Sequence, residues 1–217
     1  MKKTLVLAAL AIAGALSASA QSNVYSLNIV GYVNTVIKGN SQYTLVANPL
    51  VAPTNDLVSI IGNSLPNKSQ ILTFDGVGYF TSTKGSGVWG SNLNLPVGTG
   101  FFVKNGIAGS PDITNTFVGN VLGGLPSTNT VAIPVGYSLV GSPVPIGGTL
   151  NDSGPNTLNL GGVLANKSQV IVYDSVGGYF TSTKGSGVWG SNLQLSVGQG
   201  FFIKAQTAGS NWVQILQ

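Results

Sequence analysis

Hydrophobic residues along the chain occur in short runs, and Gly, Asn, Ser and Pro separate the runs. This pattern is typical of β-strands joined by turns. We expect strands over residues 27–37, 43–48, 69–74, 78–83, 87–89 and 100–104, and again over 130–133, 137–141, 168–173, 178–183, 187–189 and 200–204. Asp75-Gly76 predicts a tight hairpin turn, because this pair of residues tolerates the positive φ that such turns need.

A single stretch, Asn55–Ile61, has the pattern of a helical turn. Asn55 is the expected N-cap, since an Asn side chain accepts a hydrogen bond from the first backbone N–H groups. The corresponding stretch at 156–160 has a weaker pattern. The sequence therefore predicts an all-β fold.

The strongest feature of the sequence is an internal repeat. Residues 79–104, YFTSTKGSGVWGSNLNLPVGTGFFVK, recur at 179–204 as YFTSTKGSGVWGSNLQLSVGQGFFIK. Only four of the 26 positions differ, and these are Asn94/Gln194, Pro96/Ser196, Thr99/Gln199 and Val103/Ile203. The match extends upstream, where 67–75 resembles 166–174 and 43–49 resembles 137–143. Each copy has the size of a small domain.

The ends of the repeats are less distinct. Ala108–Ser110 recurs as Ala208–Ser210, so Trp212–Leu216 takes the place of the segment near 113–118. Residues 28–33 also resemble 116–121, which leaves open that one strand ends the first copy and starts the second. We expect a signal peptide at 1–20 and two β-rich, sandwich-like repeats at 21–112 and 113–217.

The N-terminus has the three parts of a secretory signal peptide. Lys2 and Lys3 precede an apolar run from Leu5 to Leu16, and the small residues 17–20 follow. A membrane span needs ~20 apolar residues, so this run is too short, and we expect no transmembrane segment in the mature chain. The prediction is export, with a secreted or cell-surface location and the periplasm also allowed.

Composition limits the chemistry. Charged residues make up 6% of the chain, against ~25% in an ordinary soluble domain. All nine basic residues are Lys and all five acidic residues are Asp, while His, Cys, Arg and Glu are absent. Most side chains that perform acid–base or metal chemistry are missing, so we expect no enzyme, no cofactor and no metal site. Scattered lysines without Arg also predict no nucleic-acid partner.

Three motifs suggest chemistry and fail on inspection. The GxGxxG of residues 85–90 is not followed by a helical pattern, so we interpret it as a structural turn. Ser82 and Lys84 share a strand face but lack a third group to hold the base.

Asp75 and Asp174 are equivalent and could form a carboxylate pair for glycoside hydrolysis. We favour turn residues there, because Asp caps nearby backbone N–H groups.

Aromatic residues recur at equivalent positions in both copies. Successive strand residues point to opposite faces, so one member of each Tyr79-Phe80 and Phe101-Phe102 pair should face outward. An outward ring can stack on a sugar. We predict one aromatic-centred site in each repeat, and its candidate ligand-binding residues are Trp89, Trp189, Tyr79, Tyr179, Asn92 and Asn192. The alternative is that these aromatic residues fill the core.

Three segments carry a resemblance to known proteins. They are Asn28–Val33, Tyr43–Leu50 with the sequence YTLVANPL, and Leu95–Val103 with the sequence LPVGTGFFV. In these the chain resembles a group of uncharacterised exported bacterial proteins with tandem β-rich modules. The second copy departs from the pattern at Gly141-Ser142 and Ser196. The resemblance implies β-rich surface or secreted modules and assigns no catalytic residue.

The observations together predict a secreted, non-enzymatic structural or adhesive protein of the bacterial cell surface or extracellular matrix. Its expected partners are copies of itself or cell-surface polymers, because low charge and exposed strand edges favour association. The alternative is a carbohydrate-binding module with polysaccharide as its partner.

Overall fold

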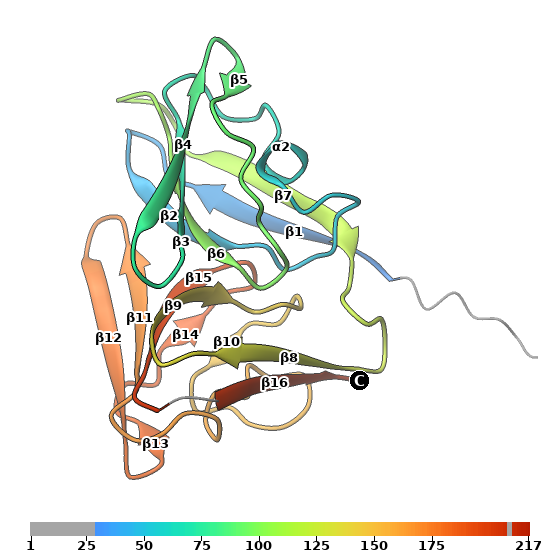
Figure 1. Cartoon of the computed structure of the whole chain (residues 1–217), viewed down its shortest axis with the longest axis vertical. Helices are drawn as coiled ribbons and strands as arrows, with labels where there is room; N and C mark the ends of the chain where they lie inside the picture. The colour runs from blue at the N-terminus through green and yellow to red at the C-terminus, as the bar shows by residue number, and fades with distance from the viewer. Residues whose placement is uncertain (1–28, 208–209) are drawn as a thin grey trace, which may run out of the picture.

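A computed structural model describes residues 29–207 and 210–217 of the chain (Figure 1). The described part consists of β-strands and one four-residue helix, which confirms the prediction of an all-β fold. The predicted signal peptide at 1–20 lies outside the described residues.

The repeated segments form equivalent strands. The first half of the chain contains β1 (Val30–Ile37), β2 (Tyr43–Ala47), α2 (Leu57–Ile60), β3 (Gln70–Phe74), β4 (Tyr79–Gly85), β5 (Val88–Trp89), β6 (Gly100–Lys104) and β7 (Ile113–Asn120). The second half contains β8 (Ser127–Ile133), β9 (Gly136–Gly141), β10 (Gly148–Thr149), β11 (Gln169–Asp174), β12 (Gly178–Gly185), β13 (Val188–Trp189), β14 (Gln194–Leu195), β15 (Gly200–Ala205) and β16 (Ser210–Leu216). Most strands lie within a few residues of their predicted ranges.

Both repeats have the same topology. The first contains a sheet in the order β2-β6-β3-β4-β5, and the second contains the equivalent order β9-β15-β11-β12-β13. Each also has an antiparallel two-stranded ribbon, β1 with β7 and β8 with β16. The ribbons confirm that Trp212–Leu216 is equivalent to the segment that begins at Ile113. β7 pairs with β1 over its whole length, and the second ribbon starts with its own strand β8, so no strand is shared between the two ribbons.

The repeats contact each other through two equivalent sets of backbone hydrogen bonds. Val46 of β2 forms a bridge with Gln199, and the equivalent Val140 of β9 forms a bridge with Thr99. The Ala47 N–H donates to the Gly198 carbonyl at 2.8 Å, and the Gly141 N–H donates to the Gly98 carbonyl at 2.9 Å. Because each contact is repeated with the copies exchanged, the repeats are related by an approximate two-fold axis.

Three apolar clusters stabilise this arrangement. One is centred on Phe101 in the first repeat and also takes in Val144 and Leu216 from the second. Another, with Phe201 and Trp212, lies within the second repeat. The third lies between the repeats and consists of Leu45, Phe102, Leu139 and Phe202.

The neighbouring phenylalanines point to opposite faces, as predicted, but the expectation that one of them faces solvent was wrong. Phe101 is buried in the core of its own repeat and Phe102 is buried in the cluster between repeats. The second repeat covers the face that would be open in an isolated copy. In the Tyr79-Phe80 pair both side chains are exposed, Tyr79 at 49% and Phe80 at 56%.

The helix begins one residue later than predicted. Asp56 is the N-cap, and its carboxylate accepts a hydrogen bond from the Ser59 N–H at 2.8 Å. The prediction of Asn55 as the cap was therefore wrong, because the Asn55 side-chain oxygen accepts from the Ala52 N–H instead. No helix forms at 156–160, where Leu158 and Leu160 are buried in irregular backbone.

Candidate functional site

An aromatic groove lies where the two five-stranded sheets meet, and the strand register explains its composition. In β3 and β4, Phe74 is directly opposite Tyr79, and directly opposed residues share a face of the sheet. Leu72 of the same strand is opposite Phe102 of β6. One face of each sheet is therefore aromatic. The backbone contacts between the repeats, at Val46 with Gln199 and Val140 with Thr99, bring these two faces together.

The groove contains two cavities that are equivalent under exchange of the repeats. One, of about 220 Å³, is lined by Tyr43, Leu72, Tyr79, Phe102, Tyr173 and Tyr179. The other, of about 330 Å³, is lined by Tyr137, Ile171, Tyr179, Phe202, Phe74, Tyr79 and Thr181. Tyr79 and Tyr179 line both cavities, with 49% and 57% of their surface exposed. These two rings therefore lie at the centre of the groove.

Ring-to-ring contacts cross between the repeats. Phe102 meets Tyr173 edge-on with centroids 5.4 Å apart, and Phe74 meets Phe202 edge-on at 5.7 Å. Within each repeat, the Phe74 and Tyr79 centroids are 5.1 Å apart, as are those of Tyr173 and Tyr179. Edge-to-face pairs at such distances are favourable. These ring contacts, within and between the repeats, fix the positions of the groove side chains.

Each cavity has a lysine over one of its tyrosine rings. The Lys104 ammonium is 5.4 Å from the centroid of Tyr43, and the Lys204 ammonium is 5.2 Å from that of Tyr137. Burial raises the pKa of the Tyr79 phenol. Burial, followed by the nearby Tyr79 and Tyr173, raises the pKa of Tyr179. Both phenols are therefore neutral near pH 7 and can donate as well as accept hydrogen bonds.

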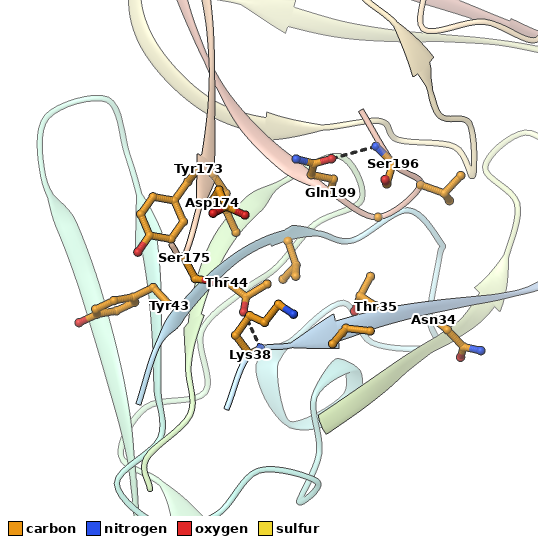
Figure 2. Close-up of a pocket in the computed structure, with 15 residues that line it drawn as sticks. Asn34, Thr35, Lys38, Tyr43, Thr44, Tyr173, Asp174, Ser175, Ser196 and Gln199 are labelled. Atoms are coloured by element: carbon orange, nitrogen blue, oxygen red, sulfur yellow. Dashed lines mark hydrogen bonds between the residues drawn. The ribbon is translucent and has the colours of Figure 1, made fainter. Parts of the chain in front are cut away.

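A third, more polar cavity of about 330 Å³ continues from the groove and also has Tyr43 and Tyr173 in its wall (Figure 2). Lys38, Thr35 and Thr44 border it on one side, while Ser196 and Gln199 border it on the other. The site thus consists of an aromatic groove with a polar cavity beside it.

The six residues predicted as ligand-binding do not come together. Tyr79 and Tyr179 line the groove, but Trp189 is only 3% exposed and Trp89 is half-buried against the first core. The indole N–H of Trp89 donates to the Gly62 carbonyl at 3.0 Å. That of Trp189 donates to the Leu160 carbonyl at 3.4 Å. Each indole is therefore bound to its own repeat.

The predicted asparagines hold backbone in place. The Asn92 side-chain oxygen accepts from the Val58 N–H at 3.0 Å, and the Asn192 oxygen accepts from the Asn151 N–H at 2.9 Å. The Asn side chain binds helix α2 in the first repeat, and a loop in the second, to the segment after the short strand that carries the tryptophan. Neither residue lines a cavity described above.

Ser82 and Lys84 share a strand face, as the spacing predicted, and both are buried. The Ser82 hydroxyl donates to the Ser91 carbonyl at 2.6 Å, and the Lys84 ammonium donates to the Leu65 carbonyl at 2.8 Å. In the second repeat the Lys184 ammonium donates to the Leu164 carbonyl at 2.7 Å. These partners fasten loops to the β4 and β12 strands.

The two equivalent aspartates cap turns. Asp75 accepts from the Gly78 N–H at 2.8 Å, and Asp174 accepts from the Gly177 N–H at 2.7 Å. Bonds of this kind stabilise the carboxylate, so they hold the pKa of each Asp below its usual value. The interpretation of Asp75 and Asp174 as turn residues is confirmed.

Sequence reasoning missed most of the groove. Tyr43 and Tyr137 recur at matching positions, and period-two alternation places each on the same strand face as the leucine two residues later. That signal was present. Phe74 and Tyr173 also occupy matching positions, but no pattern within one copy indicates their contacts with Phe202 and Phe102 of the other repeat.

The described residues, 29–207 and 210–217, contain no cluster of three or more metal-ligating side chains. In the same part of the chain no helix is long and apolar enough to cross a membrane. Searches of protein-family models, curated proteins and solved structures found no match to this chain.

Proposed function

We propose that the protein is a non-enzymatic adhesive protein of the bacterial cell surface or extracellular matrix that binds an extended carbohydrate chain in the aromatic groove. The observation that carries the proposal is the pair of equivalent cavities on either side of Tyr79 and Tyr179. Ligand sites are typically concave, mainly apolar and lined by a few oriented polar groups. The groove has this composition.

The chemistry of the lining favours a sugar. A pyranose ring has an apolar face of C–H groups that can lie on a tyrosine or phenylalanine ring, and hydroxyls at its edge. Five tyrosines line the groove, and Lys104 and Lys204 lie over two of them, Tyr43 and Tyr137. Tyrosine combines an apolar ring with a polar tip, so the same residue can stack on the ring and hydrogen-bond a hydroxyl.

The two-fold relation favours a polymer over a single small molecule. Equivalent cavities present the same side chains twice, about the Tyr79 and Tyr179 pair. A chain with a repeated unit can occupy both cavities at once, and linked contacts bind more tightly than separate ones. Polysaccharides of cell surfaces and matrices are such chains.

Binding of soluble neutral oligosaccharides, measured by calorimetry and by tyrosine fluorescence, tests this function. The probes are cello-, xylo-, chito- and malto-oligosaccharides of graded length. Tyr79→Ala/Tyr179→Ala should weaken binding of the best probe at least about tenfold, since one well-packed aromatic contact is worth roughly 1.4 kcal/mol. Tyr32→Ala is the matched control, because Tyr32 is 72% exposed on β1 and lines none of the three cavities. Wild-type affinity in the double variant would exclude the groove as the site.

Self-association is a second candidate function, and it is favoured by apolar side chains at the tips of two hairpin turns. Val77 is 94% exposed and Val176 is 88% exposed, close in sequence to Phe80 and Phe180, which are also exposed. Exposed apolar patches of this kind mark interaction sites. Light scattering over a concentration series should show growth in mass that Val77→Ser/Val176→Ser abolishes. A constant monomer mass in the wild-type protein would exclude this candidate.

A further inference from the structure

The polar cavity beside the groove breaks the two-fold symmetry, and the sequence differences between the repeats coincide with it. Residues 79–104 and 179–204 differ at four positions, and two of these, Ser196 and Gln199, line the polar cavity. Their equivalents in the first repeat are Pro96 and Thr99. The two segments are identical at the other 22 positions, so half of their differences lie at this wall of the cavity.

The two differences depend on each other. The Ser196 N–H donates to the Gln199 side-chain oxygen at 2.9 Å (Figure 2). Proline has no N–H, and the threonine side chain is too short to reach back in the same way, so this bond cannot form between Pro96 and Thr99. The bond leaves the Gln199 amide nitrogen on the side away from Ser196, and Gln199 is one of the residues that line the cavity (Figure 2). Only the second repeat therefore supplies an oriented amide donor.

The opposite wall is also one-sided. Thr35 of β1 packs so close to Gly198 that a Cβ atom at 198 would lie 2.8 Å from the Thr35 methyl carbon. At the equivalent Gly98 the nearest atoms to a Cβ would instead belong to Pro143 and Gly141. β1 thus brings Asn34 and Thr35 to this cavity, and Lys38 follows directly after the strand.

Most of the polar groups in the lining are neutral hydrogen-bonding groups. The Lys38 ammonium is paired with Asp112 at 2.9 Å. Asp174 accepts two backbone N–H groups of its own turn. The other carboxylate oxygen of Asp174 can still accept from a ligand hydroxyl, and the neutral polar groups of the lining include the hydroxyls of Ser175 and Ser196, the phenols of Tyr43 and Tyr173 and the amide of Gln199. Hydroxyl and amide groups of this kind match the hydroxyls of an uncharged sugar.

We propose that the polar cavity is an end subsite that receives one neutral sugar residue of the chain held in the groove, so that the chain binds in a single direction. This inference rests on the proposed function. Tyr43 and Tyr173 line both the cavity and the groove, so a chain can pass from one to the other without leaving the protein surface.

The test exchanges the diverged residues between the repeats. Ser196→Pro/Gln199→Thr gives the second repeat the residues of the first, and Pro96→Ser/Thr99→Gln is the matched control at the equivalent wall. The probes are the same neutral oligosaccharides of graded length. In the wild-type protein, affinity should rise about tenfold at the length that reaches the cavity, as expected for one or two added hydrogen bonds. The first variant should lose this increase and bind shorter probes unchanged, while the control keeps it.

The first variant is expected to fold, because Pro96 occupies the equivalent position in the first repeat and the Ser196 N–H bonds only to the side chain of Gln199. Gln199→Ala removes the oriented amide without adding proline and should also lose the increase. The inference is overturned if both variants keep the wild-type length dependence. If Tyr79→Ala/Tyr179→Ala abolishes binding in that case, the proposed function survives alone. If no probe binds the wild-type protein, both proposals fail.

Discussion

Gly200 lies against the backbone of Val46, so close that a Cβ atom at position 200 would be 2.5 Å from the Val46 carbonyl oxygen. The equivalent Gly100 stands in the same relation to Val140, at 2.8 Å. These are the glycines that precede the two Phe-Phe pairs of the repeated sequence. Glycine is required at both positions because each repeat crosses the backbone of the other there.

Gly200→Ala should lower the free energy of unfolding by about 1–3 kcal/mol, the usual cost of forcing an extra methyl group into a packed contact. Urea denaturation measures this. Gly185→Ala is the control, because nothing lies within 4 Å of a Cβ atom there. We expect a change within about 0.5 kcal/mol in the control. Equal stability of the two variants would mean that the repeats do not cross as described.

Lys184→Met should destabilise the protein by about 1–3 kcal/mol, because it leaves the buried Leu164 carbonyl without its charged donor. The Lys184 ammonium also lies 6.0 Å from the centroid of Trp189, and burial lowers its pKa. Lys167→Met is the matched control on an exposed lysine and should be near neutral. Thermal and urea denaturation of both variants distinguish a buried tether from an ordinary surface lysine.

Stability should be insensitive to pH from about 5 to 8 and should fall below about pH 4. The chain contains no His, Glu or Cys, and no Asp side chain titrates between pH 5 and 8. Hydrogen bonds lower the pKa of all five Asp in the folded state. Their contribution is therefore complete above the unfolded value of about 3.9 and is lost as pH falls through the lower folded values. Urea denaturation at a series of pH values measures the effect, and a midpoint that stays constant down to pH 2 would contradict it.

Trp89→Phe/Trp189→Phe separates the groove from a tryptophan-centred site. We expect oligosaccharide affinity to stay within about twofold of wild type, because neither indole lines the groove, while the lost N–H bonds cost roughly 1 kcal/mol each in stability. Calorimetry and thermal denaturation give the two readouts. Loss of binding with unchanged stability would return the site to Trp89 and Trp189.

Several features could be predicted because they depend on neighbours in the sequence. Alternation and turn residues located most strands, and Asp75-Gly76 forms the turn that its residue types predict. Other local signals were ambiguous. Asn55 and Asp56 are both good caps, and only the backbone conformation selects Asp56. The strands that carry Trp89 and Trp189 have two residues each, too few for alternation to indicate which way the indoles point.

The sequence by itself determined the β-strands, the doubling of the unit and the poverty of acid–base groups, because strand patterns, turns and composition are properties of the chain read locally. Only the tertiary structure decided that Tyr79 and Tyr179 share one groove and that Ser196 and Gln199 face a cavity with β1. These arrangements arise from contacts between segments far apart in the sequence, such as Val46 with Gln199, and such contacts depend on how whole sheets pack. A single copy of the repeat holds half of the groove, and packing of the second copy against it completes the site.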